Sequence, residues 1–242
     1  MQKFLPRFFS FFLVCFTACG QTAESGSATS KNSLPLDLYQ SATSLSPHLY
    51  NGARYHIYDS RSKDHQFYES EEWSPGSVLY DSQSFEAVPM LYDIVKDKVV
   101  IKYQNRSGLI QLQSERVARF SYLNHRFIRL ERNEAAGVDI PTGFYDLLYD
   151  GKLQVLARRV KQRQEQIENN RVNVYFLPKN FYYIKKDGVY HPIPSKKAAL
   201  SLLEEQKKAL KKHLRDQGIK YRKARESAIV QMATKYDQLL HP

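Results

Sequence analysis

Short runs of alternating apolar and polar residues dominate the chain between about residues 54 and 193. The runs are rich in Tyr, Phe, Val and Ile and are bounded by turn-forming residues, which is the pattern of half-buried β-strands. In one run Val99, Ile101 and Tyr103 share a face, and in another Phe120 and Tyr122 do. Because only a few residues separate successive runs, neighbouring strands are expected to pair as hairpins. The pattern predicts an antiparallel β-meander, in a barrel-like or half-closed sheet.

Two Asp-Gly pairs mark expected hairpin turns. Asp150-Gly151 and Asp187-Gly188 each lie between apolar runs, and this dipeptide favours tight turns whose central residues both have positive φ. Residues 159–171 break the alternation with a charged segment, "RVKQRQEQIENNR". That segment is either a long hairpin tip or a short helix.

The periodicity changes to that of a helix after Pro194. Ser195 is a suitable N-cap, and four leucines follow with helical spacing, at positions 200, 203, 210 and 214. A second helical stripe runs from about residue 222 to residue 240. The chain is therefore predicted to be α+β, with an antiparallel β domain over residues 46–194 and a C-terminal hairpin of two helices over residues 195–242, packed on the sheet.

The N-terminus, "MQKFLPRFFSFFLVCFTACGQTAES", has the composition of an export signal. Lys3 and Arg7 precede an apolar run from Phe8 to Ala18, which is too short to span a bilayer and typical of a signal peptide. Residues 1–19 are thus predicted to be a signal peptide. The small polar residues that follow indicate a flexible tether over residues 20–45.

Two modes of signal cleavage fit this segment. "FTAC", which ends at Cys19, resembles a bacterial lipobox, in which the cysteine is lipidated and becomes the first residue. The alternative is ordinary cleavage after Gly20, which would give a soluble periplasmic or secreted protein. The polar spacer favours the lipobox, since an anchored domain must clear the membrane. We expect a lipoprotein tethered to the cell envelope through Cys19, with more than one acyl chain as a stable anchor requires.

The cysteine content and the net charge reduce the number of functions that fit the sequence. The two cysteines, Cys15 and Cys19, both lie in the signal region, so the mature chain is expected to have no disulfide, thiolate nucleophile or cysteine metal site. The formal net charge is +11, but an exported protein is not expected to meet nucleic acid. Residues 196–225 hold eleven Lys or Arg residues, either as a solvated helix face or as a surface for anionic headgroups.

Recognisable catalytic motifs are absent, and the seven His residues have no ligand-like spacing. Residues 64–72, "DHQFYESEE", lack the spacing of a calcium loop and indicate a solvated loop. Asp146 and Asp150 lie four residues apart in an expected strand, about 13 Å, whereas paired glycosidase carboxylates are at most about 9.5 Å apart. We therefore predict no catalytic, cofactor-binding or metal-binding residues, and no cofactor.

Aromatic residues carry the remaining signal for binding. Residues 50–76 are the densest polar-aromatic stretch, and exposed Tyr and Trp can stack on sugar rings or anchor a protein partner. The candidate recognition surface consists of Tyr50, Tyr55, Tyr58, Tyr68 and Trp73. The alternative is that these rings pack one face of a sheet.

The dipeptide Tyr-Asp occurs six times, whereas random placement of 17 Tyr and 12 Asp would give about one occurrence. Because several pairs lie near expected turns, the repetition is interpreted as architecture. Together with "LYNGARYHIYD", the stretches "VLYDSQSFEAVPMLYDIVKDKVVI" and "GFYDLLYDGKLQVLARR" resemble an uncharacterised group of exported, lipoprotein-like proteins of Bacteroidota, over roughly residues 45–240. The resemblance implies a cell-envelope setting and no functional residues.

The expected function is non-catalytic binding or scaffolding at the cell envelope, with a protein or glycan partner. A carrier of an apolar ligand such as lipid would instead need an apolar cavity between sheet and helices. An enzyme acting on envelope glycan or peptide would need carboxylates or His residues that converge in a pocket with shifted pKa values.

Overall fold

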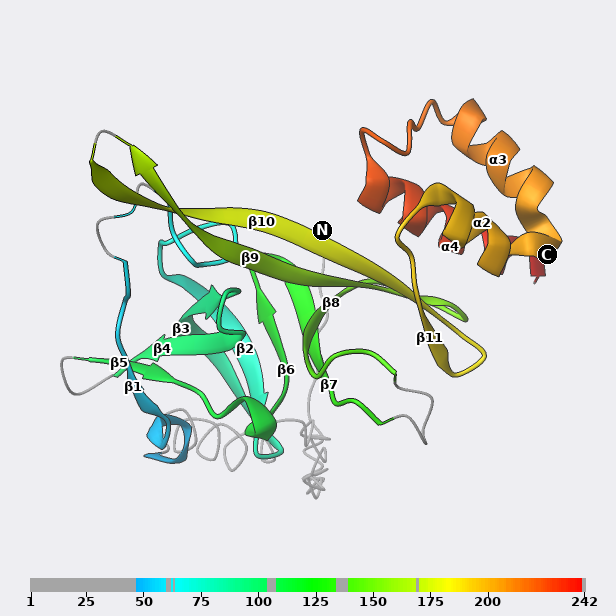
Figure 1. Ribbon diagram of the computed structural model, residues 1–242. Coiled ribbons are helices and arrows are strands. Elements are labelled where there is room, and N and C mark those ends of the chain that lie inside the picture. Colours follow the sequence, from blue (N-terminus) through cyan, green and yellow to red (C-terminus); the bar gives the residue numbers. More distant parts are fainter. Residues whose placement is uncertain are drawn as a thin grey trace, which may run out of the picture. The chain divides into compact units, whose positions relative to one another are not determined.

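The computed structural model describes residues 47–59, 62, 64–103, 108–133, 139–168 and 170–240. The predicted signal peptide, tether and lipidation site Cys19 lie outside the described residues. Within them, one antiparallel sheet that does not close is followed by helices (Figure 1), which confirms the predicted fold class. The strands are β1 Ala53–Tyr55, β2 Ser74–Tyr80, β3 Gln83–Asp93, β4 Lys98–Lys102, β5 Leu109–Gln111, β6 Val117–Tyr122, β7 His125–Leu130, β8 Gly143–Asp150, β9 Gln154–Glu168, β10 Arg171–Lys186 and β11 Val189–Pro192.

The strand order is β1-β5-β4-β3-β2-β6-β7-β8-β9-β10-β11. It differs from a simple meander at two pairings, β1 with β5 and β2 with β6. Two runs of hairpin-connected strands, β2 to β5 and β6 to β11, are thus joined through the 3-10 helix η2, Ser114–Arg116. A second short 3-10 helix, η1, spans Pro47–Tyr50 and precedes β1.

Tight turns close three of the hairpins. Both central residues have positive φ between β2 and β3 (Asp81, Ser82), between β6 and β7 (Leu123, Asn124), and between β10 and β11 (Asp187, Gly188). The Asp187-Gly188 turn was expected from the sequence.

The other Asp-Gly pair does not form the predicted two-residue turn. Asp150 pairs with Gln154, so three residues form the loop. A Cβ at position 151 would lie 2.5 Å from Asp237 Oδ2 on the last helix and 2.5 Å from Tyr149 Oη, so that a larger residue would displace these two side-chain ends.

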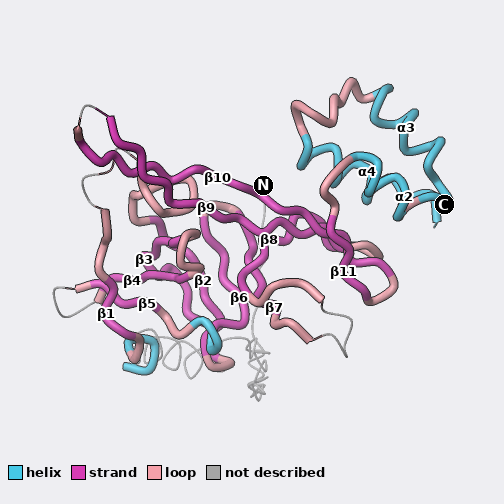
Figure 2. The backbone as a smooth tube through the Cα atoms, in the orientation of Figure 1, coloured by secondary structure: helices cyan, strands magenta, loops and turns pink. Residues whose placement is uncertain are grey.

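Residues 159–171 belong to a long hairpin, as one of the two sequence interpretations proposed. β9 and β10 pair continuously from Arg171 opposite Glu168 to Lys185 opposite Gln154, and the two strands run side by side across the view (Figure 2). Beyond the part that pairs with β8, the hairpin is a two-stranded ribbon.

The sheet is apolar on both faces near β3 and β4. Because successive side chains point to opposite faces, Tyr92 joins a large aromatic cluster while Leu91 joins a smaller one on the other side. The large cluster includes Tyr80, Phe120, Phe127 and Phe144, and the small one includes Tyr55, Phe67 and Val100. A polar side chain on either face is therefore buried.

The first predicted helix is in fact two helices. The backbone of Leu203 leaves the helical region (φ −107°, ψ 42°) and separates α2 (Lys196–Leu202) from the 3-10 helix η4 (Glu204–Gln206) and from α3 (Lys207–Asp216). Ser195 is the N-cap, as expected, and its side chain accepts a 3.2 Å hydrogen bond from the Ala198 amide.

The second predicted helix is α4, Arg225–Leu240. Its Ile229 and Met232 are buried in one cluster with Val155 and Ala157 of the sheet, so the helices pack on the end of the sheet formed by β8 and β9. None of the helices in the described part of the chain is long and apolar enough to cross a membrane.

Candidate functional site

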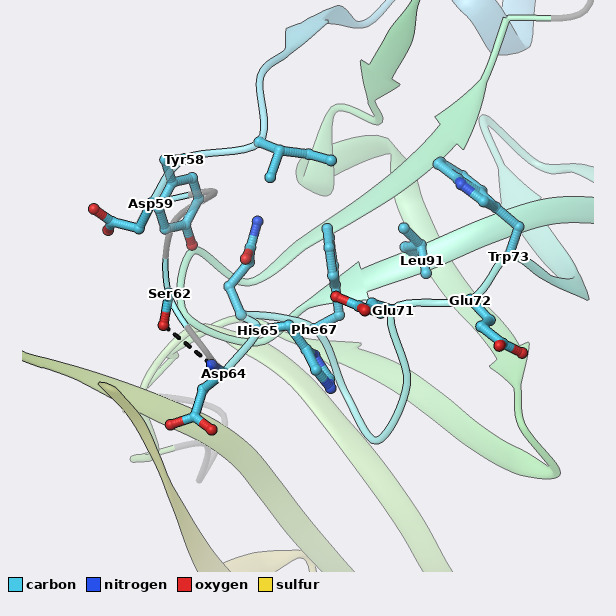
Figure 3. A pocket seen from close by; sticks show the side chains of 12 residues that line it. Tyr58, Asp59, Ser62, Asp64, His65, Phe67, Glu71, Glu72, Trp73 and Leu91 are labelled. Carbon is cyan, nitrogen blue, oxygen red and sulfur yellow. Dashed lines mark hydrogen bonds between the residues drawn. The ribbon is translucent and has the colours of Figure 1, made fainter. Parts of the chain in front are cut away.

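A cleft of about 510 Å³ opens between the segment of residues 57–73 and strand β3 (Figure 3). Its walls combine aromatic, aliphatic and acidic side chains. The lining residues are Ile57, Tyr58, Asp59, Ser62, Asp64, His65, Gln66, Phe67, Glu71, Glu72, Trp73 and Leu91.

Backbone hydrogen bonds fix the inner wall of the cleft to β3. The Tyr68 amide donates to the Tyr92 carbonyl over 2.8 Å, and the Ile94 amide donates to the Gln66 carbonyl over 3.2 Å. Lys161 of β9 reaches across, and its Nζ donates to the carbonyls of His65 and Phe67, each over 2.7 Å. The inner wall is thus held from two strands that are far apart in sequence.

Asp93, at the end of β3, holds the Tyr58 side of the cleft. Its carboxylate is completely buried and accepts hydrogen bonds from the hydroxyls of Tyr55 (2.8 Å) and Tyr58 (2.9 Å). It also accepts from the amides of Val95 (2.9 Å) and Lys96 (3.0 Å), which closes the turn into β4. Burial, with the Asp93 charge adding to it, raises the pKa of Tyr58, so this hydroxyl remains a donor.

Four carboxylates give the cleft its charge. Asp59 is bound by Arg163, whose hydrogen bond lowers the pKa of that carboxyl, and Asp64 accepts from the Phe176 amide over 3.4 Å. Glu71 and Glu72 are exposed on the opposite lip. Burial, together with nearby Lys161, lowers the pKa of His65. Cations balance part of the negative charge, because Lys96 Nζ lies 3.7 Å from the Tyr58 ring centroid and Lys102 Nζ lies 4.8 Å from that of Trp73.

The structure separates the five predicted recognition residues. Tyr58 and Trp73 line the cleft, but Tyr55 and Tyr68 are only 4% and 5% exposed and lie in the apolar clusters beneath it. Tyr50 lies apart, with its ring centroid 5.1 Å from that of Tyr103. No group of three or more side chains that could hold a metal ion occurs among the described residues.

A second group of polar side chains, centred on Asp146, spans three adjacent strands. Asp146 of β8 is 1% exposed, and its Oδ2 accepts hydrogen bonds from Arg159 Nε (3.0 Å) and Nη2 (2.6 Å) of β9 and from His125 Nδ1 (2.8 Å) of β7. The other ring nitrogen of His125 lies 3.1 Å from the Tyr68 hydroxyl. This chain links the core to the segment that forms the cleft.

Arg159 also reaches the first turn of α4. It is 6% exposed, and its Nη1 lies 2.5 Å from Glu226 Oε2, which in turn accepts from the Tyr182 hydroxyl over 3.1 Å. Burial raises the pKa of Asp146, and Arg159 only partly offsets this. The hydrogen bonds that Arg159 donates to Glu226 and Asp146, with the Asp146 charge, outweigh burial and raise the pKa of Arg159. We take the pair as ionised, since arginine keeps its proton and three donors converge on one carboxylate oxygen.

The Glu226 contact predicts a specific pH dependence. Burial would raise the pKa of Glu226, but hydrogen bonds from Arg159 and Tyr182 dominate and lower it below 4.5. A lowered carboxyl pKa contributes stability above the unfolded value, and this contribution is lost as the pH falls through the folded value. Wild type should exceed Glu226→Gln in free energy of unfolding at neutral pH, and the difference should vanish in acid. Urea denaturation at a series of pH values measures it; a constant difference would contradict the assignment.

The repeated Tyr-Asp pairs gain a structural explanation. In a strand, a Tyr that enters one apolar cluster sends the next residue to the opposite face. For Tyr92-Asp93 and Tyr145-Asp146 that face is also covered, so the Asp is buried and needs donors. Tyr236-Asp237 serves similarly from α4, where Asp237 accepts from the Tyr149 hydroxyl (3.0 Å) and the Leu153 amide (3.1 Å).

No family model, no curated protein and no solved structure matches the chain. Among the residues that build the site, the sequence indicated Tyr58 and Trp73 but missed Asp93, Arg159 and Glu226. The Tyr-Asp repetition was the available signal for Asp93. Arg159 lies in the segment that had been interpreted only as a charged extension.

Proposed function

We propose that this protein is a non-catalytic binding protein of the cell envelope, and that it holds its ligand in the cleft beside Tyr58 and Trp73. The observation that carries the proposal is the composition of that cleft: aromatic and aliphatic surface on an anchored wall, facing two exposed carboxylates, Glu71 and Glu72. Aromatic surface supplies contact area, and a few placed polar groups supply orientation.

The polar centre at Asp146 supports binding over catalysis. His and carboxylate side chains meet there, as an enzyme would require, and they also meet at the surface, where His48 Nε2 lies 2.6 Å from Asp81 Oδ2. The Asp146 carboxylate is 1% exposed and bound by Arg159, and Arg159 itself is 6% exposed. The donors converge on the Asp146 carboxylate, and little of its surface is open to a ligand. This cluster is therefore suited to hold β7, β8, β9 and α4 together.

The close packing between the sheet and the helices favours a binding or scaffolding role over the carrying of an apolar ligand. A carrier needs space between sheet and helices, but α4 packs there directly. Ile229, Met232 and Ala233 are each fully buried against Leu153 and Val155.

The envelope setting rests on the N-terminal sequence and on the resemblance to exported Bacteroidota proteins. We propose that the signal peptide is cleaved before Cys19 and that Cys19, then the first residue, carries the lipid anchor. Residues 20–45 then form a tether that lets the cleft reach partners near the membrane.

Site-specific crosslinking in intact cells tests the proposal. A photoreactive amino acid at Glu72, on the exposed lip of the cleft, should give a discrete covalent adduct identifiable by mass spectrometry. The same group at Glu115, exposed on η2 outside the lining, is the matched control. Adding Trp73→Ala to the Glu72 variant should remove most of the adduct. Identical adducts at both positions, or none at position 72, would refute binding in the cleft.

A further inference from the structure

Four lysines converge on a depression of about 400 Å³ formed by the short helices. Lys196 and Lys197 come from α2, and Lys207 and Lys211 come from α3, with Leu200 and Ser201 completing the lining. The break at Leu203 brings the two helical segments together around this depression.

A second depression, of about 370 Å³, adjoins the first and shares Lys196. It is lined by Pro194, Ser195, Lys196, Tyr221, Arg222 and Arg225. Among the described lining residues of both depressions there is no Asp or Glu. Arg225 donates to the Ile193 carbonyl over 2.6 Å, and its guanidinium lies over the Tyr182 ring. We call the five other cationic residues the basic face: Lys196, Lys197, Lys207, Lys211 and Arg222.

The positions of two of the lysines are costly for α3. Lys207 and Lys211 of α3 are a like-charge pair at i,i+4, which destabilises a helix. A bound anion would reduce this repulsion.

Glu205, in the short 3-10 helix between α2 and α3, does not neutralise the basic face. Glu205 of η4 is bound by Lys186 Nζ over 2.8 Å and accepts from the Tyr236 hydroxyl over 3.2 Å, so its charge is directed toward the sheet and α4. The neighbouring Glu204 is exposed and does not line either depression.

We propose that the basic face binds anionic lipid headgroups at the membrane surface through their clustered negative charge. Lysine is a compact, rotatable cation suited to phosphate, and clustered Lys and Arg residues recognise anionic lipid surfaces by charge. This contact is separate from the cleft and does not depend on the lipid anchor. It would give a tethered protein a preferred orientation on the membrane.

Vesicle co-sedimentation tests this proposal with the mature chain, residues 19–242, carrying Cys19→Ser, so that neither an acyl chain nor the apolar signal segment contributes. The protein should bind phosphatidylcholine vesicles that contain phosphatidylglycerol and should not bind phosphatidylcholine alone. Replacing all four lysines (Lys196→Gln, Lys197→Gln, Lys207→Gln, Lys211→Gln) should weaken binding by roughly 600-fold, since each basic residue contributes roughly fivefold. Increasing salt should weaken binding of the parent chain.

A matched control removes the same charge from exposed strand positions: Arg54→Gln, Arg119→Gln, Arg171→Gln and Lys179→Gln. It should keep nearly all vesicle binding; an equal loss would show attraction by net charge and overturn the site. Inorganic phosphate should compete no better than chloride at equal ionic strength, and selective competition by phosphate would assign the face to free phosphate instead. Circular dichroism establishes that both variants are folded, and loss of binding with retained helicity supports the proposal.

Discussion

Replacing Arg159 with leucine is expected to lower the free energy of unfolding by about 3–5 kcal/mol, because it leaves a buried carboxylate without its cation. Asp146 is 1% exposed and receives two of its three side-chain hydrogen bonds from Arg159. The same change releases Glu226, so α4 should lose part of its attachment to the sheet. Urea denaturation followed by circular dichroism measures the stability, and hydrogen exchange of the α4 amides measures the attachment.

Two comparisons make this result specific. The double variant Asp146→Leu/Arg159→Leu removes both charges and should recover much of the loss, since replacing a buried pair by apolar residues is often neutral. Arg163→Leu breaks the Arg163–Asp59 pair, which lies at the surface with Arg163 36% exposed, and should cost about 1 kcal/mol or less. If Arg159→Leu were as mild as Arg163→Leu, the buried network would not be a main support of the fold.

Replacing Asp93 with alanine is expected to cost about 3 kcal/mol or more and to weaken binding in the cleft. Four donors, two tyrosine hydroxyls and two amides, would lose a buried acceptor, and each unsatisfied buried group costs about 1–3 kcal/mol. Tyr58 would also lose the bond that orients its ring along the cleft wall. Trp73, the one Trp of the chain, also lines the cleft, so its fluorescence reports local loosening while circular dichroism follows global unfolding.

Asp93→Asn is the conservative partner of this experiment. Its amide oxygen can keep the bonds from Val95 and Lys96, and its amide group can donate to the tyrosine hydroxyls once they rotate to accept. It should therefore lose much less stability than Asp93→Ala and retain more of the Glu72 adduct. Equal effects of the two variants would mean that the volume of the side chain, and not its hydrogen bonds, holds the cleft wall.

The local architecture was largely predictable, because strands and helices leave short-range patterns. Alternation at Val99, Ile101 and Tyr103, the Asp187-Gly188 turn and the Ser195 cap all report on residues near themselves. The prediction of a two-residue turn at Asp150-Gly151 was wrong. The loop there contacts Asp237, more than eighty positions away. The residue types in the turn itself do not predict such a distant contact.

The same limit applies to the functional surfaces. Tyr50, Tyr55 and Tyr68 shared a polar-aromatic stretch with Tyr58 and Trp73, but burial distinguishes them, and burial follows from which sheet face each side chain meets. The Arg159 network joins three consecutive strands to α4, and its contact with Glu226 spans 67 positions of the sequence. The break at Leu203 has no Gly or Pro to announce it, and it is this break that brings the lysines of α2 and α3 around one depression.

The open side of β10 has a consequence for the behaviour of the protein at high concentration. From Arg171 to Tyr182 this strand pairs with β9 alone among the described strands, and such an edge invites addition of a strand from another molecule. Three features obstruct it: Ser62 and Asp64 already bond the Val174 carbonyl and the Phe176 amide, Pro178 offers no amide hydrogen, and the Tyr182 carbonyl accepts from Ile193. The segment that borders the cleft therefore also hinders the addition of a strand from another molecule. Variants that loosen the contacts of Ser62 and Asp64 with β10 are expected to precipitate more readily.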